Sequence, residues 1–367
     1  MNFRVIAQGF GQPSDATRKF IAYIMEQDNL LESTWSDAVS NDPKHRPQII
    51  DWPSTTVRKE WCRRPQEAYL ADGKKIRRMS VAEIAAIQGF SEEWVNVDGI
   101  TTNERIAVLG NAVPPPISRL LARLVFENFH FEHNTLIEIC AGIGGLSSGF
   151  TFLTPIAKIE LWDVAAKILR TNKPWPSACV VEGKAQDFDY SKYINKVGLL
   201  CGGPPCQPWS MSGKQKGADD PRDVMGFTPT AIAECEPEMF LFENVPGLLL
   251  VKEHSKYVED LFNRMSNPKE GLKYGLATIV LNAANYGVPQ LRKRVFIMGI
   301  KGKSNIFVKK LLNKLIKMET HHDPSKAAIG KQPWVTLREA FSDIPVTEPW
   351  REWNATPETL ARLGIEY

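Results

Sequence analysis

The sequence predicts a large α/β domain on a mostly parallel sheet, together with a smaller irregular domain formed by the two ends of the chain. Between Thr135 and Ile300, short apolar runs alternate with helical patterns. Runs that are hydrophobic throughout are typical of strands covered by helices on both faces of a parallel sheet. They read "LIEIC", "IAKIE", "VGLLC", "EMFLF", "LATIVL" and "RVFIMGI". Because only a loop separates the last two, we expect them to form an antiparallel hairpin at the sheet edge.

Two helices are predicted before this region. In "MSVAEIAAIQGF", Ser80 has the chemistry of an N-cap, Glu83 completes a capping box, and Gly89 ends the helix. A second helix follows "GNAVPPP" and runs toward residue 129. Both helices therefore precede the first strand of the predicted sheet.

A third helix is predicted after the sheet, in "NIFVKKLLNKLIKM". Its pattern places Phe307, Leu311 and Leu315 on one face and four lysines elsewhere. This arrangement favours a surface helix packed on the core over a dedicated DNA-binding stripe.

The two ends of the chain differ from this middle part. Residues 1–55 and 319–367 contain Trp, Pro, His and polar residues with weak periodicity. We expect them to form the smaller, split domain, and residues 56–318 to form the large one.

Composition limits the classes of protein that the chain can be. The net charge of +3 neither requires nor excludes a nucleic-acid partner, and no apolar run is long enough to span a membrane. The start of the chain has no secretory signal, which favours a cytoplasmic protein. The six cysteines contain no CxxC pair, so we expect reduced thiols, and neither a disulfide framework nor a bound metal.

A glycine turn follows the first strand, in "LIEICAGIGGLSSGF". Gly142, Gly144 and Gly145 would let backbone amides approach a ligand at the carboxyl edge of the sheet. The spacing is GxGG, which disfavours a dinucleotide or triphosphate site. A tight turn from strand to helix is the alternative.

Glu160 ends the next strand. Doubly wound folds present a carboxylate to ribose hydroxyls at this position, so a ligand that contains ribose is favoured over a solvated strand end.

Cys206 and Glu243 each follow a strand, in "VGLLCGGPPCQPWS" and "LFENVPGLL". Both should lie on the carboxyl edge, where a thiolate nucleophile and a carboxyl group could act on one substrate ring. A loop thiol and a strand-end cap are the alternatives.

Gln290, Arg292 and Arg294 alternate in "GVPQLRKRVF". If this segment is a strand, the three side chains share one face, and the two guanidinium groups suit a phosphate or carboxylate. A charged edge strand that blocks aggregation is the alternative.

Taken together, these segments resemble the DNA (cytosine-5) methyltransferase family from about Arg63 to Gly299. The motifs are "AGIGG", "GGPPCQPWS", "DDPRD", "ENV", "QLRKR" and "GNAVPPP". The resemblance implies the S-adenosylmethionine-dependent methyltransferase fold, which is a Rossmann-like mostly parallel sheet, plus a small target-recognition domain. It also implies methyl transfer from S-adenosyl-L-methionine to C5 of a cytosine flipped out of double-stranded DNA, with S-adenosyl-L-homocysteine as product.

The resemblance also implies roles for individual residues. Cys206 would be the nucleophile, Glu243 would engage the cytosine ring, and Arg292 and Arg294 would hold the target nucleotide. The cofactor contacts would come from Ala141, Gly142, Ile143, Gly145, Glu160, Pro205, Met225, Asn111 and Val113.

Two positions depart from the family pattern. Cys140 stands where a Phe usually packs near the adenine, which leaves that stacking weaker or to another residue such as Trp162. Gly183-Lys184 replaces the usual Gly-Asp pair that contacts the adenine amine, and Asp187 is the candidate substitute.

The motif order is also permuted, because "GNAVPPP" precedes the glycine turn instead of following the recognition region. The chain therefore resembles circularly permuted members of the family. The permutation would split the target-recognition domain between the two chain ends, and a second polypeptide could be needed to complete it.

The resemblance implies a cytoplasmic, nucleoid-associated enzyme of a restriction-modification system, or one without an endonuclease partner. A non-catalytic DNA-binding subunit of the same fold and an RNA cytosine-5 methyltransferase remain as alternatives. A cysteine hydrolase is disfavoured because no histidine lies on a strand-end turn.

Overall fold

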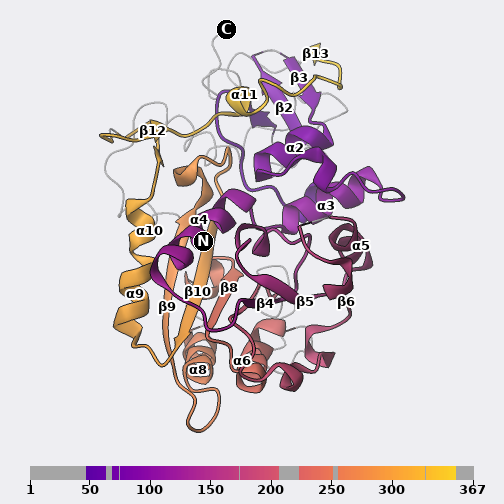
Figure 1. Cartoon of the computed structure of the whole chain (residues 1–367). Helices are drawn as coiled ribbons and strands as arrows, with labels where there is room; N and C mark the ends of the chain where they lie inside the picture. The colour runs from indigo at the N-terminus through magenta and orange to yellow at the C-terminus, as the bar shows by residue number, and fades with distance from the viewer. Residues whose placement is uncertain are drawn as a thin grey trace.

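The computed structural model describes residues 47–62, 68–73, 75–172, 174–205, 223–250, 255–326 and 328–352. Its main feature is a seven-stranded sheet with the strand order β6-β5-β4-β7-β8-β10-β9 (Figure 1). The strands are β4 (Thr135–Ile139), β5 (Thr154–Glu160), β6 (Val180–Glu182), β7 (Leu199–Gly202), β8 (Met239–Asn244), β9 (Tyr274–Asn282) and β10 (Lys293–Lys301). Every predicted apolar run forms a strand of this sheet.

The sheet is parallel from β6 to β8, and β10 runs antiparallel to both of its neighbours. β9 and β10 form the predicted antiparallel hairpin at one edge. The fold is therefore a mixed α/β methyltransferase-type sheet. Because β4, β7 and β8 are adjacent and parallel, their carboxyl ends meet on one edge of the sheet.

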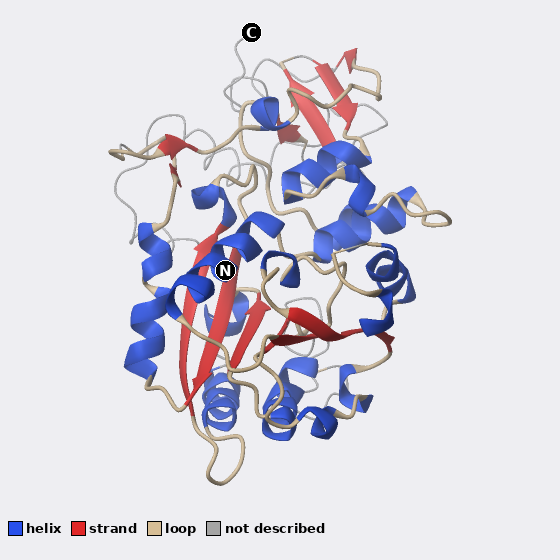
Figure 2. Ribbon diagram, in the orientation of Figure 1, coloured by secondary structure: helices blue, strands red, loops and turns tan. Residues whose placement is uncertain are grey.

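Helices cover both faces of the sheet (Figure 2). One hydrophobic cluster packs α4, α9 and α10 against Leu199, Leu241 and Phe296, and another packs α6 and α8 against Leu200 and Phe242. Neighbouring residues of a strand thus belong to opposite cores, as the alternation of side chains along a strand requires. The helices are α2 (Val81–Gln88), α3 (Thr102–Asn111), α4 (Pro115–Asn128), α5 (Asp163–Thr171), α6 (Val224–Cys235), α7 (Gly247–Leu250), α8 (Ser255–Ser266), α9 (Asn305–Leu312), α10 (Lys314–Lys317) and α11 (Leu337–Ala340).

The helix predictions are confirmed upstream and need one correction downstream. Ser80 and Glu83 form the capping box of α2, and Gly89 ends it with φ 75°. The third helix is broken at Asn313 into α9 and α10, and Phe307 is 41% exposed while Val308 is buried. Leu311 and Leu315 are buried as predicted, so the correction concerns only the first position of the face, where Val308 is buried instead of Phe307.

A smaller sheet lies at the top of Figure 1, with the strand order β1-β2-β3-β13. Its strands are β1 (Gln48–Ile49), β2 (Tyr69–Asp72), β3 (Lys75–Arg78) and β13 (Arg351–Glu352), and a third sheet pairs β11 (His321–His322) with β12 (Gln332–Pro333). Segments from both ends of the described chain thus meet in the small sheet. The boundary predicted at residue 55 falls between β1 and β2.

A further hydrophobic cluster joins the small sheet to the large one. It contains Ile50, which follows β1, Leu70 of β2, residues of α2, α3 and α5, and Ile143 of the glycine turn. The glycine turn is therefore packed against the part of the chain that precedes it in sequence. Among the described residues, no helix combines the length and apolarity needed to cross a membrane.

Candidate active site

The glycine turn connects β4 to the 3-10 helix at Ser147–Gly149. Gly142 and Gly144 have φ of +55° and +81°, a region that favours glycine, and the Gly144 amide donates to the Ala141 carbonyl at 2.8 Å. A Cβ added to Gly142 would meet open space, whereas one added to Gly144 would overlap Trp175. Gly142 thus presents bare backbone to the carboxyl edge of the sheet, and Gly144 is required by packing.

Cys140 begins this turn with φ +48°, which is unusual for a residue with a side chain. Burial raises the pKa of its thiol well above the ordinary value, and the nearby Glu160 acts in the same direction. A raised pKa disfavours the thiolate form, so this thiol is poorly suited to act as a nucleophile.

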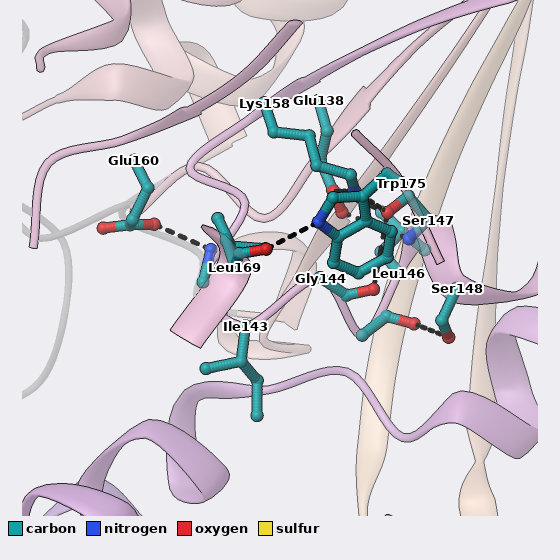
Figure 3. Close-up of polar contacts among 12 residues, drawn as sticks. Glu138, Ile143, Gly144, Leu146, Ser147, Ser148, Lys158, Glu160, Leu169 and Trp175 are labelled. Carbon is teal, nitrogen blue, oxygen red and sulfur yellow. Dashed lines mark hydrogen bonds and ion pairs between the residues drawn. The ribbon is translucent and has the colours of Figure 1, made fainter. Parts of the chain in front are cut away.

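Glu160 lies at the end of β5, beside the turn. Its carboxylate, labelled in Figure 3, accepts a hydrogen bond from the Gly142 amide at 2.7 Å. It also accepts one from the Trp162 amide at 2.8 Å. Burial raises the pKa of Glu160, and the backbone donors partly offset that rise. The predicted ribose carboxylate and the predicted glycine turn are thus in direct contact.

A buried charged cluster packs against the turn (Figure 3). Glu138 and Lys158 are register partners on β4 and β5, and their side chains pair at 2.6 Å while 1% and 0% exposed. Ser147 donates to Glu138 from its amide at 3.1 Å and from its hydroxyl at 2.6 Å, and Lys158 donates to the same hydroxyl. The Lys158 ammonium also lies 3.7 Å from the centroid of the Trp175 ring. The Trp175 ring therefore lies between the Lys158 ammonium and Gly144 of the turn.

The segment upstream of the sheet holds the other side of the turn. The Trp94 indole donates to the Ile143 carbonyl at 2.9 Å, and its ring packs on Trp175 with centroids 5.9 Å apart. A Cβ added to Gly145 would overlap the carbonyl of Val113. The "GNAV" segment and the glycine turn, which are distant in the familiar motif order, thus lie in contact.

Glu243 lies at the end of β8, as predicted. Its carboxylate pairs with the Arg294 guanidinium at 2.9 Å, and the two side chains are 12% and 16% exposed. A Cβ added to Gly203, which follows β7, would lie 3.7 Å from the Glu243 carboxylate. Asn244 donates to the Pro204 carbonyl at 3.1 Å. The "ENV" strand end and the "GGPP" segment are therefore held together.

Gln290, Arg292 and Arg294 do not share one face of a strand. β10 begins at Lys293, so the period-two pattern does not extend to Gln290 and Arg292. These two side chains are 0% and 2% exposed, and Arg292 donates to three backbone carbonyls. In the described part of the chain, Arg294 alone of the two arginines forms an ion pair with Glu243.

The remaining predicted residues have varied positions. Asn111 is exposed at the end of α3, Val113 is buried beside the turn, and Pro205 is exposed after β7. Met225 is fully buried in the core around α6, where it has no surface to offer a ligand. Cys206 lies outside the described residues.

The two substitutes proposed for the adenine contacts are not equivalent. The Trp162 ring packs against the cluster that contains α2 and α3, and the Lys59 ammonium lies 5.3 Å from its centroid. Asp187 is exposed at the end of a 3-10 helix, Ala185–Asp187. Leu161, which the sequence analysis missed, is 64% exposed directly after Glu160 and offers apolar surface there. Its position directly after Glu160, the predicted ribose carboxylate, is the sequence signal that could have identified it.

Comparison with known proteins bears on the family. The sequence profile of C-5 cytosine-specific DNA methylases matches residues 10–127 and 134–358. Type II methyltransferase M.AquIA of Picosynechococcus sp. is 34% identical over 239 residues, which cover 58% of this chain and 90% of that protein. Type II methyltransferase M.NgoMIV of Neisseria gonorrhoeae is 37% identical over 178 residues, or 48% of this chain and 54% of that protein. The chain thus spans about half the length of the second relative.

Among solved structures, the Entamoeba histolytica methyltransferase EhMeth aligns with a TM-score of 0.37 at 24% identity, covering 46% of this chain and 53% of that one. A score this low adds no argument, so the assignment rests on the sequence profile and on M.AquIA. Because the profile matches well over half of the chain, the chain belongs to the C-5 cytosine-specific DNA methylase family, which makes it a DNA cytosine-5 methyltransferase with S-adenosylmethionine as methyl donor.

Proposed function

We propose that the chain methylates C5 of a cytosine flipped out of duplex DNA, with Cys206 as nucleophile and Glu243 as the group that engages the ring. The observation that carries this proposal is the order of three adjacent parallel strands. β7, which leads to Cys206, lies between β4, which leads to the glycine turn, and β8, which ends in Glu243. A nucleophile on that connection has the cofactor turn on one side and the carboxyl group on the other.

The chemistry follows from these positions. The Cys206 thiolate adds to C6 of the cytosine while Glu243, in its protonated form, supplies a proton to the ring nitrogen N3, which makes C5 nucleophilic. S-adenosylmethionine, when bound, supplies the methyl group that C5 takes up. A base then removes the C5 proton, the bond from C6 to sulfur breaks, and the N3 proton is released, which restores the aromatic ring and the free thiolate. Arg294 holds the Glu243 carboxylate in place by their ion pair.

The residues at the glycine turn fit a ribose-containing cofactor. Gly142 faces open space where a side chain would otherwise lie, and the Glu160 carboxylate is fixed beside it by two backbone amides. A carboxylate held in this way suits two ribose hydroxyls. The other predicted cofactor contacts would come from backbone atoms and packing at the same turn, at Ala141, Ile143, Gly145 and Val113. Two more would come from the rim of the turn, at Asn111 and Pro205. No metal ion is needed in this reaction.

We also propose that the chain is circularly permuted and that its recognition domain is split between its ends. α4 leads into β4 through residues 129–134, and the profile match is interrupted at the same connection. The small sheet, which joins β13 to β1–β3, supports the pairing of the two ends. A second polypeptide could complete this domain, and the Type II names of the relatives favour a restriction-modification role in the cytoplasm, at the nucleoid.

The test incubates the purified chain with labelled S-adenosylmethionine and duplex DNA, and maps the modified base. We expect label on C5 of cytosine in one sequence context. Label on RNA but not DNA would instead favour the RNA methyltransferase, and DNA binding without transfer would favour a non-catalytic subunit. Activity that appears only after a second chain is added would support the incomplete recognition domain.

The nucleophile is tested by Cys206→Ser, with Cys140→Ser as the matched control. We expect Cys206→Ser to retain S-adenosylhomocysteine binding and to lose transfer by at least about 1,000-fold. The control should retain transfer, because the raised pKa of the Cys140 thiol disfavours a thiolate there. Full transfer by Cys206→Ser would overturn the assignment.

A further inference from the structure

Gln290 binds a segment of the chain that lies far away in sequence. Its side-chain oxygen accepts from the Val57 amide at 2.9 Å, and its side-chain amide donates to Gln88 at 2.9 Å. The backbone adds two hydrogen bonds, from Ser54 to Pro289 at 2.9 Å and from Leu291 to Ser54 at 2.8 Å. The residues before β10 are thus paired with residues 54–57.

Arg292 extends this contact to the end of α3. It donates to the Val57 carbonyl at 3.0 Å, and its other terminal nitrogen donates to the carbonyls of Gly110 and Ala112 at 3.2 and 3.0 Å. These carbonyls flank Asn111 in "GNAV", where the helix ends and its carbonyls lack intrahelical partners. The planar guanidinium can serve both segments at once because its donors point in fixed, divergent directions.

The same segment touches the cofactor turn. The Val113 carbonyl lies so close to Gly145 that no side chain fits between them, and the backbone of Arg58 lies equally close to Gly110. Arg292 therefore reaches the glycine turn indirectly, through the Ala112 carbonyl that it binds and the contact of the adjacent Val113 with Gly145.

Arg292 is also poorly placed for a role as a free cation. It is 2% exposed, its Nε has no hydrogen-bond partner, and the described residues give it no ion pair. Burial lowers its pKa, and the neighbouring Arg294 lowers it further. Arg294, in contrast, is 16% exposed and pairs with Glu243.

We propose that Gln290 and Arg292 form a latch that docks residues 54–57 and the "GNAV" segment onto the catalytic sheet, so that Arg292 positions the cofactor turn while Arg294 alone serves the target nucleotide. The inference rests on the proposed function for the identity of the two ligands. The family resemblance gave both arginines the same role. In this proposal Arg292 is a positioning residue, and Arg294 acts on the side of the substrate.

The experiment compares Arg292→Lys with Arg294→Lys, two identical substitutions two residues apart. A lysine at 292 keeps the charge but cannot donate to both segments at once. We expect Arg292→Lys to weaken S-adenosylhomocysteine binding by about tenfold or more, measured by calorimetry without DNA, and to lower the Tm by several degrees. Its kcat at saturating cofactor should stay within about threefold of the wild type.

Arg294→Lys should give the opposite result. Its ammonium can still pair with Glu243, so we expect an unchanged Tm and an S-adenosylhomocysteine Kd within about twofold of the wild type. The kcat should fall by about 100-fold. The inference is overturned if Arg292→Lys leaves both the Tm and the cofactor Kd unchanged, or if both variants lose transfer with intact cofactor binding.

Gln290→Leu serves if Arg292→Lys fails to fold. It removes the side-chain hydrogen bonds to Val57, Gln88 and the Ile87 carbonyl, and should increase hydrogen exchange at the Val57 amide and weaken cofactor binding in the same direction. Unchanged exchange and binding would contradict the latch. If the wild-type chain transfers no methyl group, the proposed function fails, but Tm, exchange and calorimetry still decide the latch.

Discussion

Two ion-pair clusters with similar chemistry differ in their surroundings. Beneath the glycine turn, Lys158 and Glu138 pair with side chains 0% and 1% exposed. On the small sheet, Arg338 pairs with Asp51 at 2.6 Å and with Asp72 at 2.8 Å, and these side chains are 50%, 64% and 40% exposed. Water and salt ions can replace the ion pairs of the exposed cluster, but they cannot reach the buried pair. We therefore expect substitutions in the buried cluster to affect the proposed cofactor site, and those in the exposed cluster to be tolerated.

The largest effect is expected for Lys158→Met. Removing the ammonium leaves Glu138 buried without its cation, so the free energy of unfolding should fall by about 3–5 kcal/mol. Ser147 would still donate to Glu138, but the Trp175 ring, which packs against Gly144, would lose its contact with the Lys158 ammonium. Urea denaturation measures the stability, and calorimetry with S-adenosylhomocysteine measures the weakened cofactor site.

The double variant Lys158→Met with Glu138→Leu is the control for this prediction. It removes the orphaned charge, and should recover part of the lost stability because an apolar pair of similar volume tolerates burial. A loss below about 1 kcal/mol in the single variant would show that the buried pair behaves like the exposed one.

Gly144→Ala is expected to have the next largest effect. The new methyl group would overlap the Trp175 ring, and φ of +81° disfavours alanine. Together these effects should lower the free energy of unfolding by about 2–5 kcal/mol. Gly142→Ala is the matched control, because its methyl group would enter open space at φ +55° and should cost only about 1–2 kcal/mol.

Relative to the stability that each variant loses, Gly142→Ala should weaken cofactor binding more than Gly144→Ala does. Gly142 faces the ligand side, so its methyl group should weaken S-adenosylhomocysteine binding even though the fold tolerates it. Equal stability losses in both variants, measured by urea denaturation, would contradict the role of Trp175 as the wall behind Gly144.

A smaller effect is expected for Trp94→Phe. Phenylalanine keeps the aromatic packing on Trp175 but leaves the Ile143 carbonyl without its indole donor. The loss should be about 1–2 kcal/mol, with a higher KM for S-adenosylmethionine at unchanged kcat. A fall in kcat at saturating cofactor would indicate that Trp94 acts on more than the turn.

The sheet and one half of the site could be predicted from the sequence for the same reason. Unbroken apolar runs bury on both faces of a parallel sheet, and residues at their carboxyl ends meet on one edge whatever the details of packing. Glu160 was placed beside Gly142 by this argument alone. Glu243 was placed beside the "GGPP" segment in the same way.

The buried charges could not be predicted, because they depend on register. Lys158 looked like an ordinary lysine in "IAKIE", and its partner Glu138 is identified only when β4 and β5 are aligned residue by residue. Gln290 and Arg292 were given the period of a strand that begins only at Lys293, after both of them. Apart from the Gln88 side chain, their partners are backbone carbonyls and amides, which carry no signature in the sequence.

The smallest effect is expected for Arg338→Met in the exposed cluster. The Arg338 guanidinium holds the pKa of Asp51 below its usual range through hydrogen bonds, so the pair contributes stability above the unfolded pKa of Asp51 and loses it as the pH falls through the folded value. At about pH 7 the variant should lose under about 1 kcal/mol, and less in about 0.5 M salt. The difference between wild type and variant should shrink further from about pH 6 to about pH 3, since the Asp51 carboxylate becomes protonated in both. Urea denaturation over this pH series measures it, and a constant difference down to the lowest pH would mean that Arg338 stabilises the small sheet by packing instead of charge.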